Sequence, residues 1–496
     1  MRALIGLGTA LALFAAVPGP VPALAAGSHP ALSAAQVAAI DSFVTAEMQR
    51  EHVPGLALGI YSRGTMLLAK GYGMANVELS VPVKPETIFQ SGSVGKQFVS
   101  AAVMMLVEQG KLSLDDSITK YFTDAPAAWK PILVKNLLSH TSGLAEYEDP
   151  NLTGPTGPFY LRMDYTEDEL VKKVEALPVE NAPGDKWGYR NTNYLLLGVL
   201  IHRITGAPYG DLLAQRIFKP LGMTSTRLVS EADIVPNRAA GYELHGTELK
   251  NQEWVSPTFN STADGALYFN VLDLAKWDEA LYTTKLLKQS SLDRIWTVYS
   301  LNDGKPNSNG YGFGWSIDKQ NGHTRIEHGG AWQGFTCMIS RYPDDSLTVA
   351  VLTNLDAGHS RPAVFAHVIA GLAEAPLLPP RLTAIEDTTP GIAASLRSLL
   401  DLMAAGRDIR DRVTPEFAKI ITPETTKSVQ TRVSPLWPGG TLTLVRRTPL
   451  PNDPAARTLS TFRLTKGSEV LLIVYVLTPD GKVAGLQFQP DREYQL

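Results

Sequence analysis

Residues 92–106 read GSVGKQFVSAAVMML, with a serine and a lysine three positions apart at the start of a strongly apolar run. The apolar residues follow helical spacing up to a glycine stop, which predicts a buried helix over residues 93–109. In such a helix Ser93 lies in the first turn and Lys96 follows one turn later on the same side, so their side chains can touch. Burial and the positive start of a helix both lower the pKa of a lysine, which makes Lys96 a candidate neutral base for the Ser93 hydroxyl.

The Ser-x-x-Lys pattern occurs three times in the chain, at Ser93, Ser117 and Ser316. At residue frequencies of about 6 to 7%, roughly two copies are expected by chance in a chain of this length. Ser316 lies in a strand-like segment, where positions three apart point to opposite faces, so this serine and its lysine cannot meet. Ser117 follows two aspartates at the start of a short helix, a position typical of a helix cap. The Ser93 copy is therefore the candidate nucleophile with its base.

The segments around this helix predict an α+β fold. A helix is expected at 35–49 and two strands at 55–61 and 65–70. A mainly helical stretch follows, from about 116 to 287. Further strands are expected near 312–317, 334–341 and 347–353, and a last helix at 361–373. This order predicts an antiparallel sheet that is flanked by helices, carries an inserted helical subdomain and is closed by strands far apart in the sequence.

The pattern of residues changes after Ala375. A linker-like stretch, LLPP at 377–380, is followed by two expected helices, at 391–405 and 414–421, and by four expected strands, at 441–447, 458–465, 470–477 and 482–489. We therefore expect a first domain over residues 27–378 and a small C-terminal α+β domain over residues 385–496.

Residues 1–26 have the three parts of a secretory signal peptide: a positive start, an apolar stretch and small residues at Ala23 and Ala25. The apolar stretch of about 15 residues is too short for a helix that crosses a bilayer, which needs about 20. We expect the protein to be secreted or periplasmic, and its mature part to contain no membrane span.

Composition narrows the function classes. In 496 residues, 45 Lys and Arg stand against 49 Asp and Glu, so a basic surface for nucleic acid is not predicted. The single cysteine, Cys337, excludes an intrachain disulfide and a cysteine-rich metal centre, and the nine histidines contain no His-x-x-x-His pair. We expect neither a metal nor a cofactor.

Two further motifs lie far from Ser93 in the sequence. Tyr189-Arg190-Asn191 follows a Pro-Gly turn and precedes an apolar helix, so a phenol and an amide project from a loop beside a rigid element. His328-Gly329-Gly330-Ala331 precedes an expected strand, and its glycines allow backbone N–H groups to approach a ligand closely. A second Tyr-x-Asn, at 268–270, shows that this pattern is weak evidence by itself. The three motifs Ser-x-x-Lys, Tyr-x-Asn and His-Gly-Gly in this order along the chain are more specific than any one of them.

With this set of motifs, the chain resembles the penicillin-recognising serine hydrolases related to the β-lactamases. That group includes class C β-lactamases, D-Ala-D-Ala carboxypeptidases, D-aminopeptidases and esterases. The resemblance covers residues 30–375 and rests on six segments: Ser93-x-x-Lys96, LLSHTSGL at 137–144, Pro183-Gly184 with Tyr189-x-Asn191, PLGM at 220–223, YGFGW at 311–315 and His328-Gly329-Gly330. It implies a β-lactamase/transpeptidase-like fold for the first domain.

The resemblance also implies a role for each candidate site residue. It implies that Ser93 is the acylated nucleophile and that Lys96 and Tyr189 transfer its proton. Asn191 would form a hydrogen bond with the substrate, and the backbone of Gly330 and Ala331 would lie beside it. His328 would stand where β-lactamases carry the lysine of Lys-Thr-Gly. The backbone N–H groups of Ser93 and Ala331 would then form the oxyanion hole.

The activity implied is hydrolysis of an ester or an amide, D-amino-acid peptides included, through an acyl-enzyme. The relatives typically have a threonine in the middle of the third motif, whose hydroxyl helps to hold the substrate's carboxylate, and Gly329 stands there in this chain. We therefore expect β-lactams to be poor substrates. The alternatives are a penicillin-binding receptor or scaffold that does not release its acyl group, and a weak β-lactamase or D-Ala-D-Ala carboxypeptidase. The C-terminal domain resembles the cystatin-like cone domains appended to some of these hydrolases, which implies substrate gating or oligomerisation.

Overall fold

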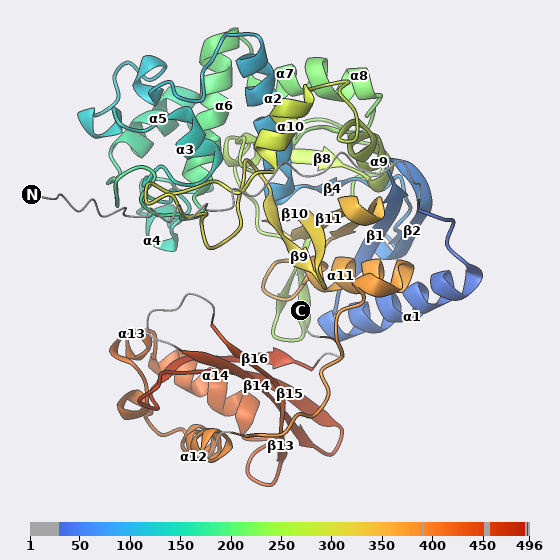
Figure 1. Cartoon of the computed structure of the whole chain (residues 1–496), viewed down its shortest axis with the longest axis vertical. Coiled ribbons are helices and arrows are strands. Elements are labelled where there is room, and N and C mark those ends of the chain that lie inside the picture. The colour runs from blue at the N-terminus through green and yellow to red at the C-terminus, as the bar shows by residue number, and fades with distance from the viewer. Residues whose placement is uncertain (1–28, 389–390, 451–456, 492–493, 495–496) are drawn as a thin grey trace, which may run out of the picture. The chain divides into compact units, whose positions relative to one another are not determined.

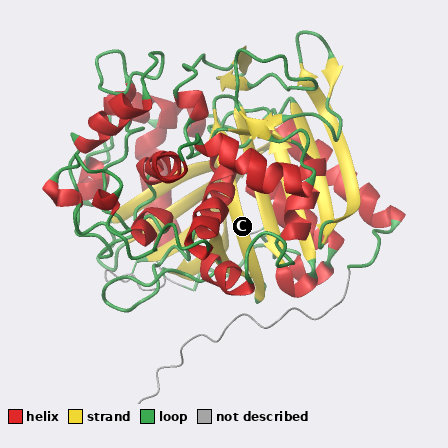
Figure 2. Ribbon diagram, turned by 90° about the horizontal axis from the view of Figure 1, so that it is seen from above, coloured by secondary structure: helices red, strands yellow, loops and turns green. Residues whose placement is uncertain are grey.

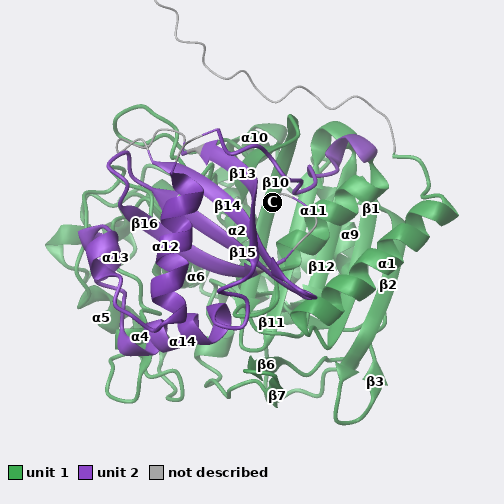
Figure 3. Cartoon of the chain, turned by 90° about the horizontal axis from the view of Figure 1, so that it is seen from below, with its two compact units in different colours: residues 1–374 green, residues 375–496 purple. Residues whose placement is uncertain are grey.

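The computed structural model describes residues 29–388, 391–450, 457–491 and 494, and its elements are labelled in Figure 1. The chain divides into two compact units, residues 1–374 and 375–496 (Figure 3). The predicted signal peptide, residues 1–26, lies outside the described residues. The stretch between the two predicted domains, residues 379–384, makes contacts inside the second unit, where the Arg463 guanidinium donates to the carbonyl of Leu382 at 3.0 Å.

A seven-stranded antiparallel sheet forms the centre of the first unit. Its strands are β1 (Gly55–Ser62), β2 (Thr65–Asn76), β3 (Val81–Pro82), β9 (Ser316–Gln320), β10 (His323–Trp332), β11 (Phe335–Tyr342) and β12 (Leu347–Thr353), in the order β3-β2-β1-β12-β11-β10-β9. Strand β1 pairs with β12, so segments almost 300 residues apart lie side by side, with Leu56 opposite Thr353. This confirms the expected antiparallel sheet closed by sequence-distant strands.

Helices cover the sheet, as the red ribbons beside the yellow strands in Figure 2 show. Helix α1 (Ala34–Glu51) packs on α11 (Pro362–Ala373), where the rings of Phe43 and Phe365 lie 6.2 Å apart, and α11 packs on β11 and β12. Helix α9 (Val271–Ala280) packs on β1, β2 and β12. Every residue of β1 and β12 is buried. Because successive side chains of a strand point to opposite faces, both faces of these central strands are covered.

A helical subdomain is inserted between β4 (Phe89–Gln90) and β9. Its helices are α2 (Lys96–Glu108), α3 (Val134–Leu138), α4 (Pro150–Thr153), α5 (Glu167–Glu175), α6 (Asn191–Thr205), α7 (Tyr209–Leu213), α8 (Lys219–Leu221) and α10 (Gln289–Ile295). The same stretch also contains the short strands β5 (Arg227–Leu228), β6 (Tyr242–His245), β7 (Glu248–Asn251) and β8 (Leu267–Phe269). These strands were not expected, because two to four residues are too few to show a strand pattern.

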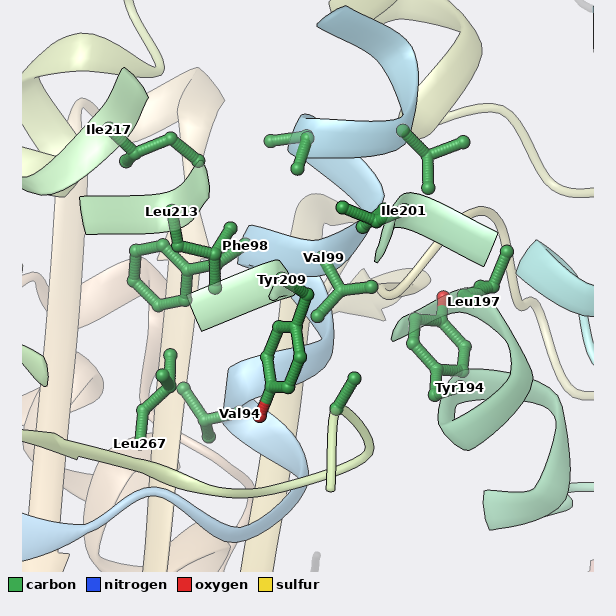
Figure 4. Close-up of a cluster of buried hydrophobic side chains, with 14 of the residues drawn as sticks. Val94, Phe98, Val99, Tyr194, Leu197, Ile201, Tyr209, Leu213, Ile217 and Leu267 are labelled. Atoms are coloured by element: carbon green, nitrogen blue, oxygen red, sulfur yellow. The ribbon is translucent and has the colours of Figure 1, made fainter. Parts of the chain in front are cut away.

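Helix α2 is the core of this subdomain. Residues 96–106 are all buried, as an all-round apolar helix requires. Figure 4 shows Val94, Phe98 and Val99 among side chains from α6 and α7. The predicted helix over 93–109 is corrected at its start, since residues 92–95 form a 3₁₀ turn, η1, before α2 begins at Lys96. Over the described residues, α2 included, no helix has both the length and the apolarity that a bilayer crossing requires.

The second unit consists of helices and a four-stranded antiparallel meander. It contains α12 (Ile392–Ala404), α13 (Pro415–Ala418), α14 (Pro423–Val433), β13 (Thr441–Pro449), β14 (Thr458–Lys466), β15 (Glu469–Leu477) and β16 (Val483–Pro490), with the strands paired in chain order. A core that includes Leu396, Phe462 and Ile473 joins the helices to the sheet. The four strands and α12 follow the sequence prediction closely. Helix α14 was not predicted, and α13 is shorter than the expected helix over 414–421.

We predict that a chain ending at Leu378 folds without the second unit, because the two units have separate hydrophobic cores. Calorimetry should show one cooperative unfolding transition for this shortened chain, as is usual for a single compact unit. The full chain is the control. Insolubility of the shortened chain under conditions in which the full chain is stable would contradict the prediction and place part of the first unit's core beyond Leu378.

Candidate active site

Ser93 and Lys96 meet at the start of α2, as their spacing predicts. The Lys96 Nζ donates to Ser93 Oγ at 2.9 Å. Gly92 has a φ of +45°, so a residue with a side chain would be strained at the point where the chain enters the 3₁₀ turn. Ser93 is partly exposed whereas Lys96 is fully buried. The turn therefore presents a hydroxyl to a pocket with an amine directly behind it.

The amine of Lys96 has three acceptors. Besides Ser93 Oγ it donates to Asn191 Oδ1 at 2.8 Å and to the backbone carbonyl of Asp264 at 2.5 Å. An ammonium has three N–H groups, so every donor is used. Burial lowers the pKa of Lys96 to about 8, although the nearby carboxyl groups act in the opposite direction. A substantial fraction of Lys96 is thus neutral slightly above neutral pH, the form that can accept the serine proton.

Tyr189 lies on the other side of the nucleophile. The Lys96 Nζ, which donates to Ser93 Oγ, lies 5.0 Å from the centre of the Tyr189 ring. Burial raises the pKa of Tyr189 well above its usual value, so the phenol keeps its proton at ordinary pH. The ring of His140 packs against that of Tyr189 with centroids 4.3 Å apart. Tyr189 is therefore a positioned proton donor beside Ser93.

Asn191 was expected on a loop, but it is the first residue of α6. Its amide is held from both ends, because Oδ1 accepts from Lys96 and Nδ2 donates to Glu148 Oε2 at 2.6 Å. Its backbone N–H donates to Glu146 Oε2 at 2.5 Å. Asn191 also lines the pocket in front of Ser93, and its role as a substrate contact stays a prediction.

His328 precedes strand β11, as expected, but it also lies in the middle of a strand that was not predicted, β10. Its Nδ1 faces the carbonyl of Gly329 at 2.6 Å, and its Nε2 faces the Tyr311 hydroxyl at 2.9 Å. Since a carbonyl only accepts, Nδ1 carries the proton and Nε2 accepts from Tyr311. Burial and the nearby charge of Lys96 lower the pKa of His328 to about 4, so the ring is neutral at pH 7. Its ring centroid is 6.2 Å from that of Tyr189.

The glycines of β10 allow the strand to approach the 3₁₀ turn. A Cβ added at Gly330 would lie 2.1 Å from the carbonyl oxygen of Ser91 and 3.0 Å from the nitrogen of Ser93. A Cβ at Gly92 would lie 2.3 Å from the nitrogen of Ala331. Ser93 and Ala331 both line the pocket, so the two residues expected to form the oxyanion hole lie at one site.

A small pocket of about 20 Å³ opens beside Ser93. It is lined by Gly92, Ser93, Glu148, Asn191, Phe259, Thr262, Asp264, Gly265, Ala266, Ala331 and Trp332. Ser93, Asn191 and Ala331 belong to the predicted site, whereas Lys96, Tyr189, His328 and Gly330 are not among the residues that line this pocket. Over the residues that the structure describes, no group of three or more His, Cys, Asp or Glu is arranged to hold a metal ion.

The structure adds Glu146, Tyr147, Glu148 and Asp264 to the site, none of which was predicted. The first three directly follow the LLSHTSGL motif, and Asp264 precedes β8, so the only signal was their closeness to a motif and to a strand. Burial, together with the neighbouring carboxylates, raises the pKa of Glu148 to about 8. The site thus combines one buried amine with several carboxyl groups.

The other two Ser-x-x-Lys copies are not sites. Ser117 caps a 3₁₀ turn and its hydroxyl donates to the carbonyl of Lys130 at 2.8 Å, while Lys120 pairs with Asp116 at 3.0 Å. Ser316 begins strand β9. Both observations agree with the geometry expected from the sequence.

The beta-lactamase family model matches residues 40–374 of the chain. Penicillin-binding protein 4* of Bacillus subtilis is 28% identical over 317 residues, which are 59% of this chain and 68% of that protein. Protein flp of Staphylococcus aureus is 26% identical over 326 residues, 64% of this chain and 63% of its own length. The chain therefore spans less than two thirds of that relative.

Solved structures show the same fold. A D-stereospecific amidohydrolase from Streptomyces sp. is 26% identical with a TM-score of 0.55, covering 64% of this chain and 94% of that one. The octameric penicillin-binding protein homologue from Pyrococcus abyssi is 23% identical with a TM-score of 0.61, and the similarity covers 92% of this chain and 99% of that one. At this identity the second likeness shows the fold alone.

We predict that Gly330→Ala and Gly329→Ala differ sharply, although they are neighbours on β10. The Cβ at residue 330 meets backbone at 2.1 Å and must push the strand from Ser93, whereas at residue 329 the nearest atom is the flexible Met338 methyl at 3.2 Å. Labelling of Ser93 by a fluorophosphonate should slow by about 100-fold or more in Gly330→Ala, because small displacements of reacting groups cost this much. Gly329→Ala should stay within about threefold of the wild type. Equal rates in two folded variants would contradict the close approach.

The pH dependence of the same labelling reaction tests Lys96. Since its pKa is about 8 and the neutral form is the base, the labelling rate should rise by about tenfold per pH unit below pH 8 and level off above it. Lys96→Ala should remove this rise and most of the rate, while Lys120→Ala, from the second motif copy, should retain both. A rate that is greatest near pH 4 would contradict the role of Lys96.

Burial also raises the pKa of Glu148 to about 8, so a second variant is needed to assign the rise of the labelling rate with pH to one of the two residues. In Glu148→Gln the rise with pH should persist if Lys96 causes it. Loss of the rise in Glu148→Gln together with its survival in Lys96→Ala would assign the titration to Glu148 instead.

Proposed function

Because the chain belongs to the beta-lactamase family, we propose that it is an exported serine hydrolase that acts through an acyl-enzyme on ester or amide substrates. The observation that carries the proposal is the 2.9 Å hydrogen bond from the buried amine of Lys96 to the Ser93 hydroxyl at the pocket. A buried lysine with a lowered pKa is one of the few arrangements that activate a serine at neutral pH.

In the proposed first half-reaction, Ser93 Oγ attacks the carbonyl carbon of the substrate. The serine proton passes to neutral Lys96, and Tyr189, which burial keeps protonated, donates its proton to the departing alcohol or amine. Transfer of a proton from Lys96 back to Tyr189 restores the charges of the resting site. The backbone N–H groups of Ser93 and Ala331 stabilise the negative oxygen of the tetrahedral intermediate.

Water completes the cycle by attacking the acyl-enzyme. Lys96 accepts a proton from this water as it did from Ser93, and Ser93 leaves with a proton donated by Tyr189. Lys96 then passes a proton to Tyr189, which restores the resting site. No metal or cofactor takes part in the proposed reaction.

The contacts around the third motif argue against substrates that carry a carboxylate. Gly329 has no hydroxyl, and neutral His328 donates its only proton to a backbone carbonyl. Arg190, inside the second motif, pairs with Glu180 at 2.8 Å and donates to the Tyr189 carbonyl at 3.0 Å. A lost hydrogen bond to a charged group costs about 1.5 to 3 kcal/mol, so β-lactams and free D-Ala-D-Ala termini are proposed to be poor substrates.

Substrates with an uncharged or amino-terminal acyl group fit this site better. Amides of D-amino acids are included, and the similarity to a D-stereospecific amidohydrolase supports them. The second candidate is a penicillin-binding receptor that is acylated but does not release its acyl group, and the relatives named as penicillin-binding proteins support it. The complete set of Ser93, Lys96, Tyr189 and His328 argues against an inactive site, so we favour the hydrolase.

Two parts of the chain have proposed roles outside the site. Residues 1–26 are proposed to direct export as a signal peptide, which makes the mature protein secreted or periplasmic. The second unit is proposed to gate substrate access or to mediate oligomerisation, and the solved homologue from Pyrococcus abyssi is described as octameric.

Intact-mass spectrometry separates the hydrolase from the receptor. With p-nitrophenyl butyrate the wild type should release p-nitrophenol over many turnovers, and with penicillin it should carry a transient adduct. Ser93→Ala should lose the turnover and the adduct while Ser117→Ala keeps them. A permanent adduct without ester turnover would favour the receptor, and labelling retained in Ser93→Ala would contradict the nucleophile.

A further inference from the structure

A cleft of about 200 Å³ lies inside the second unit, where helix α12, helices α13 and α14 and strand β16 meet. All of its lining side chains are apolar except those of Arg407 and two threonines. A well-packed core contains few voids larger than a water molecule. The cleft is therefore too large to be a packing defect of this core, and its lining shows which kind of molecule it suits.

The walls of the cleft come from separate elements. Leu486 and Phe488 lie two residues apart on β16, so both point to the same face of the sheet, and Phe417 of α13 and Val429 of α14 complete the walls. Water is held poorly in such a space, because a buried water molecule needs polar partners. An engineered protein cavity of about 150 Å³ with a similar apolar lining stays dry and binds benzene. The walls therefore suit an apolar ligand.

Arg407 is the only charged residue that lines the cleft. Its side chain is exposed, and within the described part of the chain its guanidinium has no hydrogen bond or ion pair. The hydroxyls of Thr425 and Thr426 are already used, since both donate to the carbonyl of Thr422, at 3.0 and 2.9 Å. A guanidinium only donates, and its planar fork matches the two oxygens of a carboxylate. The polar end of the ligand is therefore an anionic acceptor.

The size of the cleft limits the length of that ligand. A group as large as a water molecule or a methylene needs about 10 to 15 Å³ of such a space, so the cleft holds roughly a dozen of them. A single-chain carboxylic acid of about ten carbons has this size. A sugar or a nucleotide of the same volume would leave its polar groups without partners against the apolar walls. A lipid with two acyl chains has several times as many carbons and does not fit.

We propose that the second unit binds a free fatty acid of about ten carbons, with the acyl chain in this cleft and the carboxylate on Arg407. The apolar walls supply the affinity, and the guanidinium selects an anion over a neutral chain of the same length. The proposal gives the second unit a ligand of its own. It does not depend on the proposed hydrolase activity, because Ser93 belongs to the first unit.

Calorimetry on the full wild-type chain with a series of saturated fatty acids tests the cleft. Affinity should rise by about fourfold per methylene from hexanoate to decanoate, the factor expected for burial of one methylene. It should level off between dodecanoate and hexadecanoate, when the chain outgrows the cleft. Decanoate should also bind about tenfold or more tightly than decanol, because only the carboxylate pairs with Arg407. Equal affinities for hexanoate and decanoate, or for decanoate and decanol, would overturn the proposal.

Arg407→Gln removes the charge at the cleft without changing its apolar walls. In this variant the preference for decanoate over decanol should fall by about 10- to 150-fold, while the affinity for decanol stays within about threefold of the wild type. The matched control is Arg397→Gln on α12, an exposed arginine that does not line the cleft and whose loss should keep the wild-type preference. An unchanged preference in folded Arg407→Gln would overturn the carboxylate contact.

Two further measurements locate the acyl chain. Val429→Trp narrows the cleft and should weaken the binding of decanoate and decanol alike by about tenfold or more, whereas Lys427→Trp, at an exposed position of the same helix outside the cleft, should keep both affinities. Treatment of the wild type with a fluorophosphonate should leave the affinity for decanoate unchanged. Loss of decanoate binding after labelling of Ser93 would place the ligand in the active site and overturn the proposal. Binding to phosphatidylcholine vesicles without binding of free decanoate would also overturn it, in favour of a membrane surface.

Discussion

The fully buried amine of Lys96 is the constraint on which the site depends. Moving an ammonium out of water costs free energy unless each of its N–H groups donates a hydrogen bond within the protein. The three acceptors come from the turn at Ser93, from Asn191 at the start of α6 and from the carbonyl of Asp264, positions 95 and 168 residues beyond the lysine. The subdomain helices and the sheet must bring these segments together before the amine can be buried. Burial then lowers the pKa of Lys96 and prepares it as a base.

Much of the fold could be predicted because the central strands are continuous apolar runs, with both faces covered. Strand β10 could not, since its middle, His328-Gly329-Gly330, has a low intrinsic preference for strands. It becomes a strand by pairing with β11, where residues 326–332 lie opposite 335–341. Helix α14 was missed for a different reason. It is polar along its length and only Val433 is buried, so no apolar stripe marks it.

The parts of the site differ in how far the sequence determines them. The contact between Ser93 and Lys96 could be predicted because the two residues are three positions apart, and a single helical turn brings their side chains together. Tyr189, Asn191 and His328 were proposed from family resemblance, and the structure brings the first two into contact with the Ser93–Lys96 pair. Glu148 and Asp264 share no pattern and are 116 residues apart, so tertiary structure alone places them on either side of Tyr147.

The groups around the pocket offer few free hydrogen-bond donors to an anionic substrate. In the third motif Gly329 has no side-chain hydroxyl and His328 has a neutral ring, and the guanidinium of Arg190 in the second motif pairs with Glu180. Each of these three features weakens the binding of a substrate carboxylate. Glu148 and Asp264 also line the pocket, and their carboxyl groups add hydrogen-bond acceptors to it. The scarcity of free donors and the presence of these acceptors together support the proposal that β-lactams and free D-Ala-D-Ala termini are poor substrates.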